Sequence, residues 1–286
     1  MRGKKAGQKQ RNDGENNRYD QEEGNWSERT EHSRSVYPRG PRGWRASAIL
    51  RSVNGVLPSQ ADKPRYVAAM FERIAGRYDL MNTLMTAGQD RRWRRIVSEL
   101  ASSQRPERIL DVGTGTGRLA AALLEANRQA TVVGVDFAQA MLRQAPREVH
   151  PTRADALRLP FADEQFDAVV SAFVVRNLAD VSSGIAEQVR VLRPGGRLVV
   201  LETTPGPENR VARPLVRLYF RRIVPLLGGL IAGDASAYTY LPESTRAFLE
   251  PARLAQVLSE CGLRDINVRR LALGSVAITS GQKPNG

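Results

Sequence analysis

The sequence of 286 residues has little cysteine and histidine, few aromatic residues and no long apolar run. Its single cysteine, Cys261, has no partner for an internal disulfide, and without a Cys/His cluster no metal is expected. No stretch of about 18 uncharged apolar residues occurs, so no transmembrane helix is expected. The N-terminus also lacks the layout of a secretory signal. These absences predict a soluble protein of the reducing cytoplasm.

Basic residues exceed acidic ones, with 43 Lys and Arg against 30 Asp and Glu. Such an excess attracts polyanions, either nucleic acid or anionic lipid. It is spread along the chain, because residues 1–60 hold 12 basic and 7 acidic residues and thus only 5 of the 13 excess charges. Aromatic residues make up 6% and no compact Lys/Arg block contains stacking residues. An RNA-binding or RNA-modifying protein is therefore the weaker alternative, and no specific nucleic-acid partner is expected.

The first 60 residues differ from the rest in composition. They are dominated by Arg, Gly, Asn, Glu, Ser and Gln, with isolated apolar residues and no sustained period. This pattern predicts a disordered basic extension over residues 1–60 and a single domain over residues 61–286. Acidic residues such as Glu22 and Glu23 argue against a transit peptide.

From residue 66 onward, helical and extended patterns alternate. Two helices are expected within residues 66–100, followed by a βα rhythm that predicts a mostly parallel sheet with helices on both faces. We expect a Rossmann-like α/β fold with seven strands, the last antiparallel, N-terminal helices, and a lid insert after the fifth strand at about residues 205–248. The expected strands are 109–112, 131–135, 149–153, 166–173, 197–202, 265–271 and 275–279. The expected later helices are 119–126, 138–144, 181–192 and 254–260, with a break at 194–196.

A glycine-rich segment from Asp111 to Gly117 follows the first expected strand and precedes a helix. Gly113 and Gly115 let a ligand approach the backbone closely, and the N-terminus of the next helix suits a carboxylate. The third glycine of a dinucleotide fingerprint would fall on Arg118. The spacing therefore favours a ligand without a pyrophosphate, such as S-adenosylmethionine, which has an amino-acid end instead.

Two further acidic positions follow strands at the same edge of the predicted sheet. Asp136 ends the second strand, where its carboxylate can accept both ribose hydroxyls; the alternative is an aspartate that initiates a turn. Asp155 and Ala156 follow the third strand, within reach of an adenine amino group. A cap or turn role for Asp155 remains open on the pattern alone.

Three motifs occur in order around this loop: Tyr78–Asn82, Asp111–Gly117 and Arg190–Gly196. With them, over about residues 66–280, the chain resembles the ubiquinone/menaquinone biosynthesis C-methyltransferase family. The stretch Asp234–Ser244, which generic methyltransferases lack, makes the resemblance specific.

The resemblance implies transfer of a methyl group from S-adenosylmethionine, without a metal, to a ring carbon of a polyprenylated quinol. Demethylmenaquinol, converted to menaquinol in respiratory quinone biosynthesis, is the expected acceptor. The alternative is a methyltransferase of the same class with another small phenolic or lipid acceptor. Matching the family's motifs assigns the cofactor to Thr116, Asp136 and the Asp155–Ala156 pair. Tyr78 is expected to cover the cofactor or, alternatively, to staple the N-terminal helix.

The chain departs from the family pattern at several positions that we expect to alter the wall of the substrate pocket. These are Thr86, Asp90, Ala172, Val174, Arg193 and Thr204.

The candidate catalytic residues lie after the fourth strand and in the lid insert. Arg176 and Asn177 follow the strand at the ligand-binding edge. Arg176 would stabilise a developing phenolate; the alternative is a surface arginine paired with Asp180. Asp234, Tyr238 and Tyr240 lie in the insert and are expected to fold over the site, although either tyrosine can equally be a packing residue.

Residues 211–223 are predicted to form an amphipathic helix at the mouth of the active site. Arg210, Arg213, Arg217 and Arg221 recur at three- and four-residue intervals, so they share one helical face. Arginines on such a face attract anionic lipid, which predicts a peripheral contact with the inner face of the plasma membrane. The alternative is that the apolar face packs on the domain. The sequence leaves the oligomeric state open.

Overall fold

A computed structural model describes residues 57–206, 214, 216, 218–227 and 235–285. The disordered extension expected over residues 1–60 falls almost entirely outside the described residues. Asp234 also lies outside the described residues, and so do residues 211–213, 215 and 217 of the 211–223 segment.

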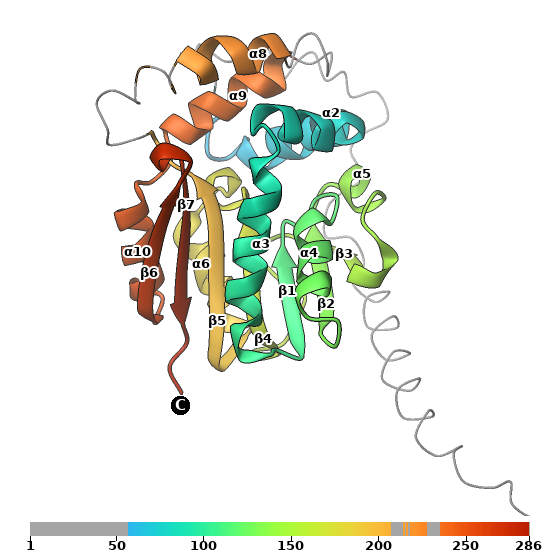
Figure 1. Ribbon diagram of the computed structural model, residues 1–286, viewed down its shortest axis with the longest axis vertical. Helices are drawn as coiled ribbons and strands as arrows, with labels where there is room; N and C mark the ends of the chain where they lie inside the picture. Colours follow the sequence, from blue (N-terminus) through green and yellow to red (C-terminus); the bar gives the residue numbers. More distant parts are fainter. Residues whose placement is uncertain (1–56, 207–213, 215, 217, 228–234, 286) are drawn as a thin grey trace, which may run out of the picture. The chain divides into compact units, whose positions relative to one another are not determined.

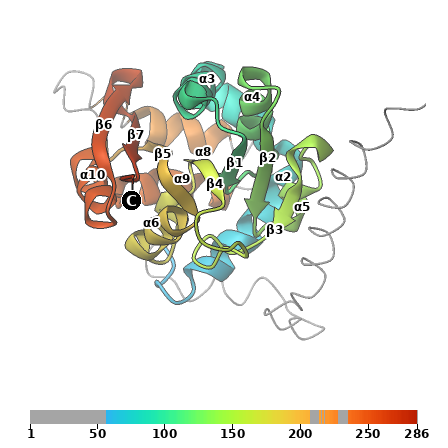
Figure 2. The same ribbon diagram turned by 90° about the horizontal axis from the view of Figure 1, so that it is seen from below.

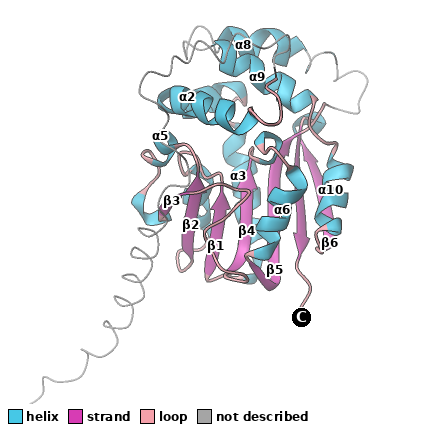
Figure 3. Cartoon of the chain, turned by 180° about the vertical axis from the view of Figure 1, so that it is seen from behind, coloured by secondary structure: helices cyan, strands magenta, loops and turns pink. Residues whose placement is uncertain are grey.

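The described chain contains a seven-stranded sheet in the order β3-β2-β1-β4-β5-β7-β6 (Figure 1, Figure 3). Strands β1 to β5 pair in parallel, whereas β7 is antiparallel to both β5 and β6. The predicted fold class, with only its last strand antiparallel, is therefore confirmed. The strands are β1 (Arg108–Val112), β2 (Thr131–Asp136), β3 (Pro151–Arg153), β4 (Phe166–Ala172), β5 (Leu192–Thr203), β6 (Arg264–Leu271) and β7 (Val276–Gln282).

Helices cover both faces of the sheet and the edge where its parallel strands end (Figure 2). On one face, α3 (Gln89–Ala101) and α4 (Arg118–Ala126) contribute apolar side chains to a core with β1, β2, β4 and β5. On the other face, α6 (Val181–Arg190) and α10 (Pro251–Glu260) do the same. A third apolar cluster joins α2 (Lys63–Met85), α5 (Gln139–Leu142), α8 (Val224–Leu227) and α9 (Ala235–Arg246) above the carboxyl ends of the strands (Figure 1).

Three expected elements differ in the structure. The break expected at residues 194–196 lies inside β5, because Gly195 and Gly196 keep backbone hydrogen bonds to Lys283 while the pairing register with β4 shifts. The helix expected over 138–144 is only α5, because after Leu142 the N–H groups of Gln144 and Ala145 donate to carbonyls three residues back. The strand expected over 149–153 begins at Pro151, after a 3₁₀ turn at Arg147–Val149.

The end of the predicted amphipathic helix is also different. Tyr219–Ile223 is a π-helix, in which the Val224 N–H donates to the Tyr219 carbonyl five residues back. The wider turn changes the spacing on which the predicted arginine face depends. Within the described residues, no helix has the length and apolar character needed to cross a membrane.

Two glycines give a matched test of the fold. A Cβ at buried Gly196 would lie 2.8 Å from the Asp167 carbonyl oxygen and 2.9 Å from that of Arg193, whereas one at exposed Gly76, inside α2, would meet no atom within 4 Å. We expect Gly196→Ala to lower the free energy of unfolding by about 1–3 kcal/mol. Gly76→Ala should raise it by about 0.5–1 kcal/mol, because alanine favours the helix. Urea denaturation of both variants measures the pair, and equal effects would contradict the packing described for β5.

Candidate active site

The glycine-rich loop connects the carboxyl end of β1 to the start of α4. Gly113 and Gly115 both have positive φ, 69° and 59°, a conformation that favours glycine. A Cβ at Gly113 would lie 2.1 Å from Val174 Cγ2, so the loop after β4 packs directly on this glycine. A Cβ at Gly115 would meet no atom within 4 Å. This side of the loop therefore opens on space for a ligand.

Four backbone N–H groups of this loop already have partners within the chain. Those of Gly113 and Thr114 donate to one carbonyl at the end of β2, at 2.7 and 2.9 Å, and that of Gly117 donates to the Thr114 carbonyl at 2.9 Å. The Gly115 N–H donates to Asp136 Oδ2 at 2.9 Å. These four groups are therefore not free to bind a ligand carboxylate, contrary to the simplest expectation for such a loop.

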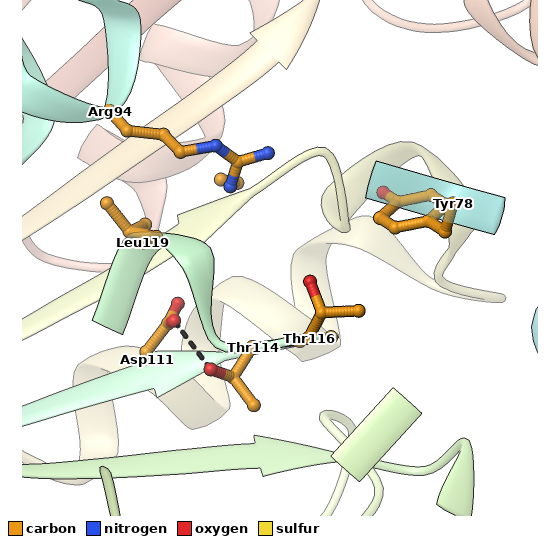
Figure 4. A pocket seen from close by; sticks show the side chains of 9 residues that line it. Tyr78, Arg94, Asp111, Thr114, Thr116 and Leu119 are labelled. Carbon is orange, nitrogen blue, oxygen red and sulfur yellow. Dashed lines mark hydrogen bonds between the residues drawn. The ribbon is translucent and has the colours of Figure 1, made fainter. Parts of the chain in front are cut away.

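Asp111 lies at the bottom of a small polar cavity between the loop and the N-terminal helices (Figure 4). Its side chain is almost fully buried, and Thr114 Oγ1 donates to Asp111 Oδ2 at 2.8 Å. The other oxygen, Oδ1, has no hydrogen-bond partner among the described residues. Burial raises the pKa of Asp111 to about 6, against the opposing effects of the Thr114 hydrogen bond and of Arg94. Tyr78, Arg94 and Thr116 complete the wall of this donor cavity.

Asp136 connects the loop to the turn that precedes α5. Its Oδ2 accepts the hydrogen bond from Gly115, and its Oδ1 accepts one from the Ala138 N–H at 2.9 Å. Burial raises the pKa of Asp136, although these backbone hydrogen bonds oppose the shift. Asp136 does not line the donor cavity with Asp111.

Asp155 and Ala156 follow β3, next to the end of β2. The Ala154 N–H donates to the Asp136 carbonyl at 3.0 Å, which keeps the two predicted cofactor segments adjacent. Asp155 Oδ1 accepts from the Leu157 N–H at 2.9 Å, so Asp155 has the turn role that the sequence left open. Ala156 packs against the apolar core on the α6 face.

An ion pair attaches the N-terminal helices to the glycine loop. Arg118, the first residue of α4, lies 3.0 Å from the buried carboxylate of Asp90 at the start of α3. Its guanidinium also donates to Thr83 Oγ1 at 3.3 Å. In addition, Thr116 Oγ1 donates to Asp79 Oδ1 at 2.8 Å. Thr116 in the loop and Arg118 at the start of α4 are therefore both bound to the N-terminal helices, and we call α2 and α3 together the α2–α3 cover.

A second and larger cavity, of about 350 Å³, lies beside the donor cavity under α2, α9 and the π-helix. Tyr78 and Arg94 line both cavities and thus form the boundary between them. The lining of this acceptor cavity is mostly apolar, with Met70, Phe71, Trp93, Phe173, Tyr238 and Leu241 among its residues.

Arg176 lies in the 3₁₀ turn after β4 and lines the acceptor cavity. Its guanidinium donates to Glu202 Oε1 at 2.6 Å, and both side chains are buried. The Thr203 N–H donates to the same oxygen at 2.8 Å. The alternative expectation, a surface pair of Arg176 with Asp180, is wrong, because Asp180 caps α6 by accepting from the Ser183 N–H.

The structure brings Asn177 and Tyr240 together in the acceptor cavity. The Tyr240 hydroxyl donates to Asn177 Oδ1 at 3.2 Å, and the Asn177 amide donates to the Phe173 carbonyl at 3.2 Å. Burial raises the pKa of Tyr240 to about 12. Tyr238 lines the same cavity. Asp234, the remaining catalytic candidate, lies outside the described residues.

Two charged neighbours of Arg176 had not been predicted. Lys63, at the start of α2, donates through Nζ to the carbonyls of Arg176 and Leu178, both at 2.8 Å. Burial and the nearby Arg176 lower the pKa of Lys63. The sequence did contain a signal for Glu202, because an acidic residue inside an otherwise apolar strand needs a buried cationic partner. It contained no signal for Lys63, because the partners of Lys63 are backbone carbonyls more than a hundred residues away.

Only some of the departures from the family pattern occupy the cavity walls. Thr86 and Asp90 line the acceptor cavity, with Thr86 Oγ1 donating to Asp90 Oδ1 at 3.1 Å. Ala172 lines the donor cavity. The other three do not line the acceptor cavity. Val174 packs on Gly113, Arg193 pairs with Asp167, and Thr204 donates to the Gly274 carbonyl.

A polar cavity at a glycine loop, joined to a larger apolar one, is the arrangement expected of an enzyme that transfers a small group between two ligands. The model of the ubiE/COQ5 methyltransferase family matches residues 59–283. The chain belongs to this family. It is an S-adenosylmethionine-dependent methyltransferase, as the sequence predicted.

Individual relatives agree with the family match. A demethylmenaquinone methyltransferase from Thermus thermophilus is 48% identical over 222 residues, covering 75% of this chain and 100% of the relative. Another from Deinococcus radiodurans is 45% identical over 229 residues, covering 78% and 94%. A solved S-adenosylmethionine-dependent methyltransferase from Thermotoga maritima has the same fold, with a TM-score of 0.54 at 19% identity, covering 75% and 99% of the two chains. These relatives do not favour the RNA-binding alternative or another small-molecule acceptor.

The donor cavity of this methyltransferase fits its cofactor. Asp111 lines this cavity and has one carboxylate oxygen without a hydrogen-bond partner among the described residues, and Gly115 leaves open space where a larger residue would place a side chain. Both features are suited to a ligand with a cationic group that lies against the backbone.

The burial of Asp111 predicts a dependence of stability on pH in the ligand-free methyltransferase. Because its folded pKa is above the ordinary value, ionised Asp111 destabilises the fold above about pH 6, and this cost disappears as the pH falls toward 4. We expect Asp111→Asn to raise the free energy of unfolding at pH 7.5 by about 1–3 kcal/mol, at 1.36 kcal/mol per pKa unit. The gain should shrink to nearly zero at pH 4. Denaturation of both proteins across this range is the measurement, and a variant less stable at every pH would contradict it.

Proposed function

We propose that this methyltransferase transfers a methyl group to a ring carbon of a polyprenylated quinol, with demethylmenaquinol as acceptor and menaquinol as product. The observation that supports this most is the apolar cavity of about 350 Å³ that shares a wall with the donor cavity. A quinol ring and the start of a prenyl chain are apolar ligands that such a cavity suits. Relatives 45% and 48% identical are named demethylmenaquinone methyltransferases.

The donor side would be held by the residues around the glycine loop. S-adenosylmethionine supplies a methyl group bound to a positively charged sulfur. Asp136 would accept the ribose hydroxyls, because each of its oxygens has one backbone donor and retains capacity for another. Asp155 and Ala156 would border the adenine, and Thr116 and Tyr78 would close the donor cavity toward the acceptor.

The acceptor side would depend mainly on electrostatics. A quinol ring carbon attacks a methyl group when the hydroxyl on the ring gives up its proton, wholly or in part. Arg176 would stabilise the resulting negative charge; its Nε is buried and has no hydrogen-bond partner among the described residues. The guanidinium remains protonated at neutral pH, so Arg176 would not serve as the base. Tyr240 and Asn177 would orient the ring, since the raised pKa of Tyr240 keeps its hydroxyl protonated.

After the carbon–carbon bond forms, the ring carbon would lose its hydrogen as a proton and the ring would become aromatic again. The quinol oxygen would regain a proton, so that the transfer as a whole releases one proton to the solvent and leaves the donor as a neutral thioether. The enzyme therefore mainly has to position the two ligands and exclude water from between them.

The decisive experiment uses a donor with a deuterated methyl group and compares reduced with oxidised demethylmenaquinone by mass spectrometry. We expect the reduced acceptor to gain one labelled methyl in place of a ring hydrogen and the oxidised acceptor to remain unchanged, because only the quinol has an ionisable hydroxyl. Arg176→Lys should lower kcat by about 10- to 1000-fold with little change in KM. Arg193→Met, which removes a partly exposed ion pair, is the control. Equal methylation of the oxidised acceptor would contradict the mechanism.

We also propose that the rim of the acceptor cavity contacts an anionic membrane, where a polyprenylated acceptor resides. Leu218, Ile223 and Leu226 are 58%, 42% and 58% exposed along the π-helix and α8. The Tyr219 hydroxyl donates to the Met85 carbonyl at 2.8 Å, so this segment adjoins the end of α2. A group of exposed apolar side chains beside an apolar cavity is typical of a surface that contacts lipid.

Co-sedimentation with anionic liposomes tests this contact. The triple variant Leu218→Ser/Ile223→Ser/Leu226→Ser should sediment at least several-fold less than the parent, because about 0.8 kcal/mol is lost for each methylene withdrawn from lipid. Val268→Ser, at an exposed position on the edge strand β6, should sediment like the parent. If the triple variant also sediments like the parent, this rim is not the lipid contact.

A further inference from the structure

The turn that joins β6 to β7, residues 272–275, lies at the edge of the sheet where the ligands bind. Strand β7 begins at Val276, beside the carboxyl end of β5, and Figure 1 shows the turn on the side of the sheet where α8 and α9 lie. Ala272, Ser275 and Val276 line the acceptor cavity. Leu273, between them, is not part of this lining and is 75% exposed. The structure thus places an apolar side chain just outside an apolar cavity.

The backbone of this turn disfavours leucine at position 273. The Ser275 N–H donates to the Ala272 carbonyl at 3.1 Å, and the two residues between them, Leu273 and Gly274, have φ of 56° and 90°. Positive φ at both central positions is the pattern of a type I′ turn, in which Asn-Gly is the preferred pair. A leucine with positive φ is strained, because its Cβ crowds the neighbouring carbonyl. The turn alone therefore does not account for the leucine.

The exposure of Leu273 is unfavourable as well. Among the large apolar side chains in the described part of the chain it is the most exposed, ahead of Leu218 and Leu226 at 58%. One exposed leucine is common on the surface of a protein. At Leu273, however, the exposure coincides with a strained backbone, and such strain tends to occur where it serves a function. The two unfavourable features at one residue indicate an apolar partner.

The acceptor cavity reaches the surface close to this turn. Gln89, at the start of α3, lines the cavity and is exposed, while Ala272 and Ser275 line it and are half-buried. Ala272 packs against the same core cluster as Trp93, one helical turn after Gln89 on α3. The start of α3 and the β6–β7 turn therefore border the cavity on the same side, where its contents can leave toward Leu273.

We propose that Leu273 binds the prenyl chain of the acceptor at the point where this chain leaves the cavity. The inference rests on the proposed function, in which the acceptor is a polyprenylated quinol. The cavity of about 350 Å³ suits the ring and the start of the chain, so the rest of a longer chain has to leave it. An apolar side chain at the exit covers hydrocarbon that would otherwise meet water. Leu273 is then a residue that determines specificity for chain length and takes no part in methyl transfer.

The test compares two demethylmenaquinols with the same ring, one with a single prenyl unit and one with several, in the same detergent without lipid. We expect Leu273→Asn to raise the KM of the long-chain quinol by about 3- to 30-fold, a part of what full burial of a leucine side chain contributes. The KM of the short-chain quinol, and kcat for both, should change by less than about twofold. Leu273→Met, which keeps an apolar side chain, should retain the KM of the parent. Val268→Asn, the matched change at an exposed position on β6, is the control and should alter neither KM.

Urea denaturation shows whether Leu273 only supports the fold. Because asparagine adopts the left-handed conformation more readily than leucine, Leu273→Asn should unfold at the same urea concentration as the parent or at a higher one. An equal rise of both KM values, or no change in either, overturns the proposal. So does a loss of co-sedimentation with anionic liposomes without a change in the long-chain KM, because Leu273 would then belong to the bilayer contact. If the parent methylates neither quinol, the proposed function itself is wrong.

Discussion

The ion pair between Arg118 and Asp90, 3.0 Å long and largely buried, determines where the active site forms. It attaches the first residue after the glycine loop to the start of α3, while Thr116 holds Asp79 on α2. Together with Lys63, whose Nζ donates to the carbonyls of Arg176 and Leu178, these contacts attach α2 and α3 to the edge of the sheet where the ligands bind. The donor cavity lies between this cover and the loop, and the acceptor cavity lies beneath it. The positions of both cavities therefore depend on the Arg118–Asp90 ion pair and the Thr116–Asp79 hydrogen bond.

Charge is distributed differently in the two cavities, and the difference matches their chemistry. The donor cavity is lined by two buried charged side chains, Asp111 and Arg94. The acceptor cavity is mostly apolar, and Arg176, in the turn after β4, is paired with the buried carboxylate of Glu202. A neutral quinol can enter such a cavity without meeting an unpaired charge at Arg176. The hydrogen-bonding capacity left on Arg176 becomes useful only when negative charge develops on the ring. The burial that raises the pKa of Tyr240 likewise keeps that hydroxyl neutral.

The fold could be predicted from the sequence because its signals are local. Apolar runs, helical spacing and the glycine loop each lie within a few residues, and they were sufficient for the mostly parallel seven-stranded sheet. The hydrogen bond between Asn177 and Tyr240 had not been predicted, although both residues were expected at the site. The partners of charged residues could not be predicted in the same way. Arg176 pairs with Glu202 because β5 lies next to β4, and Lys63 meets carbonyls more than a hundred residues away because α2 crosses the sheet edge. The π-helix at Tyr219–Ile223 was not predicted, because a three- and four-residue spacing of arginines does not show whether an N–H donates to the carbonyl four or five residues back.

The central claim is that donor and acceptor meet at the wall formed by Tyr78 and Arg94. A crystal structure of the protein with S-adenosylhomocysteine tests it most directly. The account predicts the ribose hydroxyls on Asp136 and the sulfur facing the acceptor cavity past Tyr78. A ligand whose sulfur faces away from that cavity would contradict it.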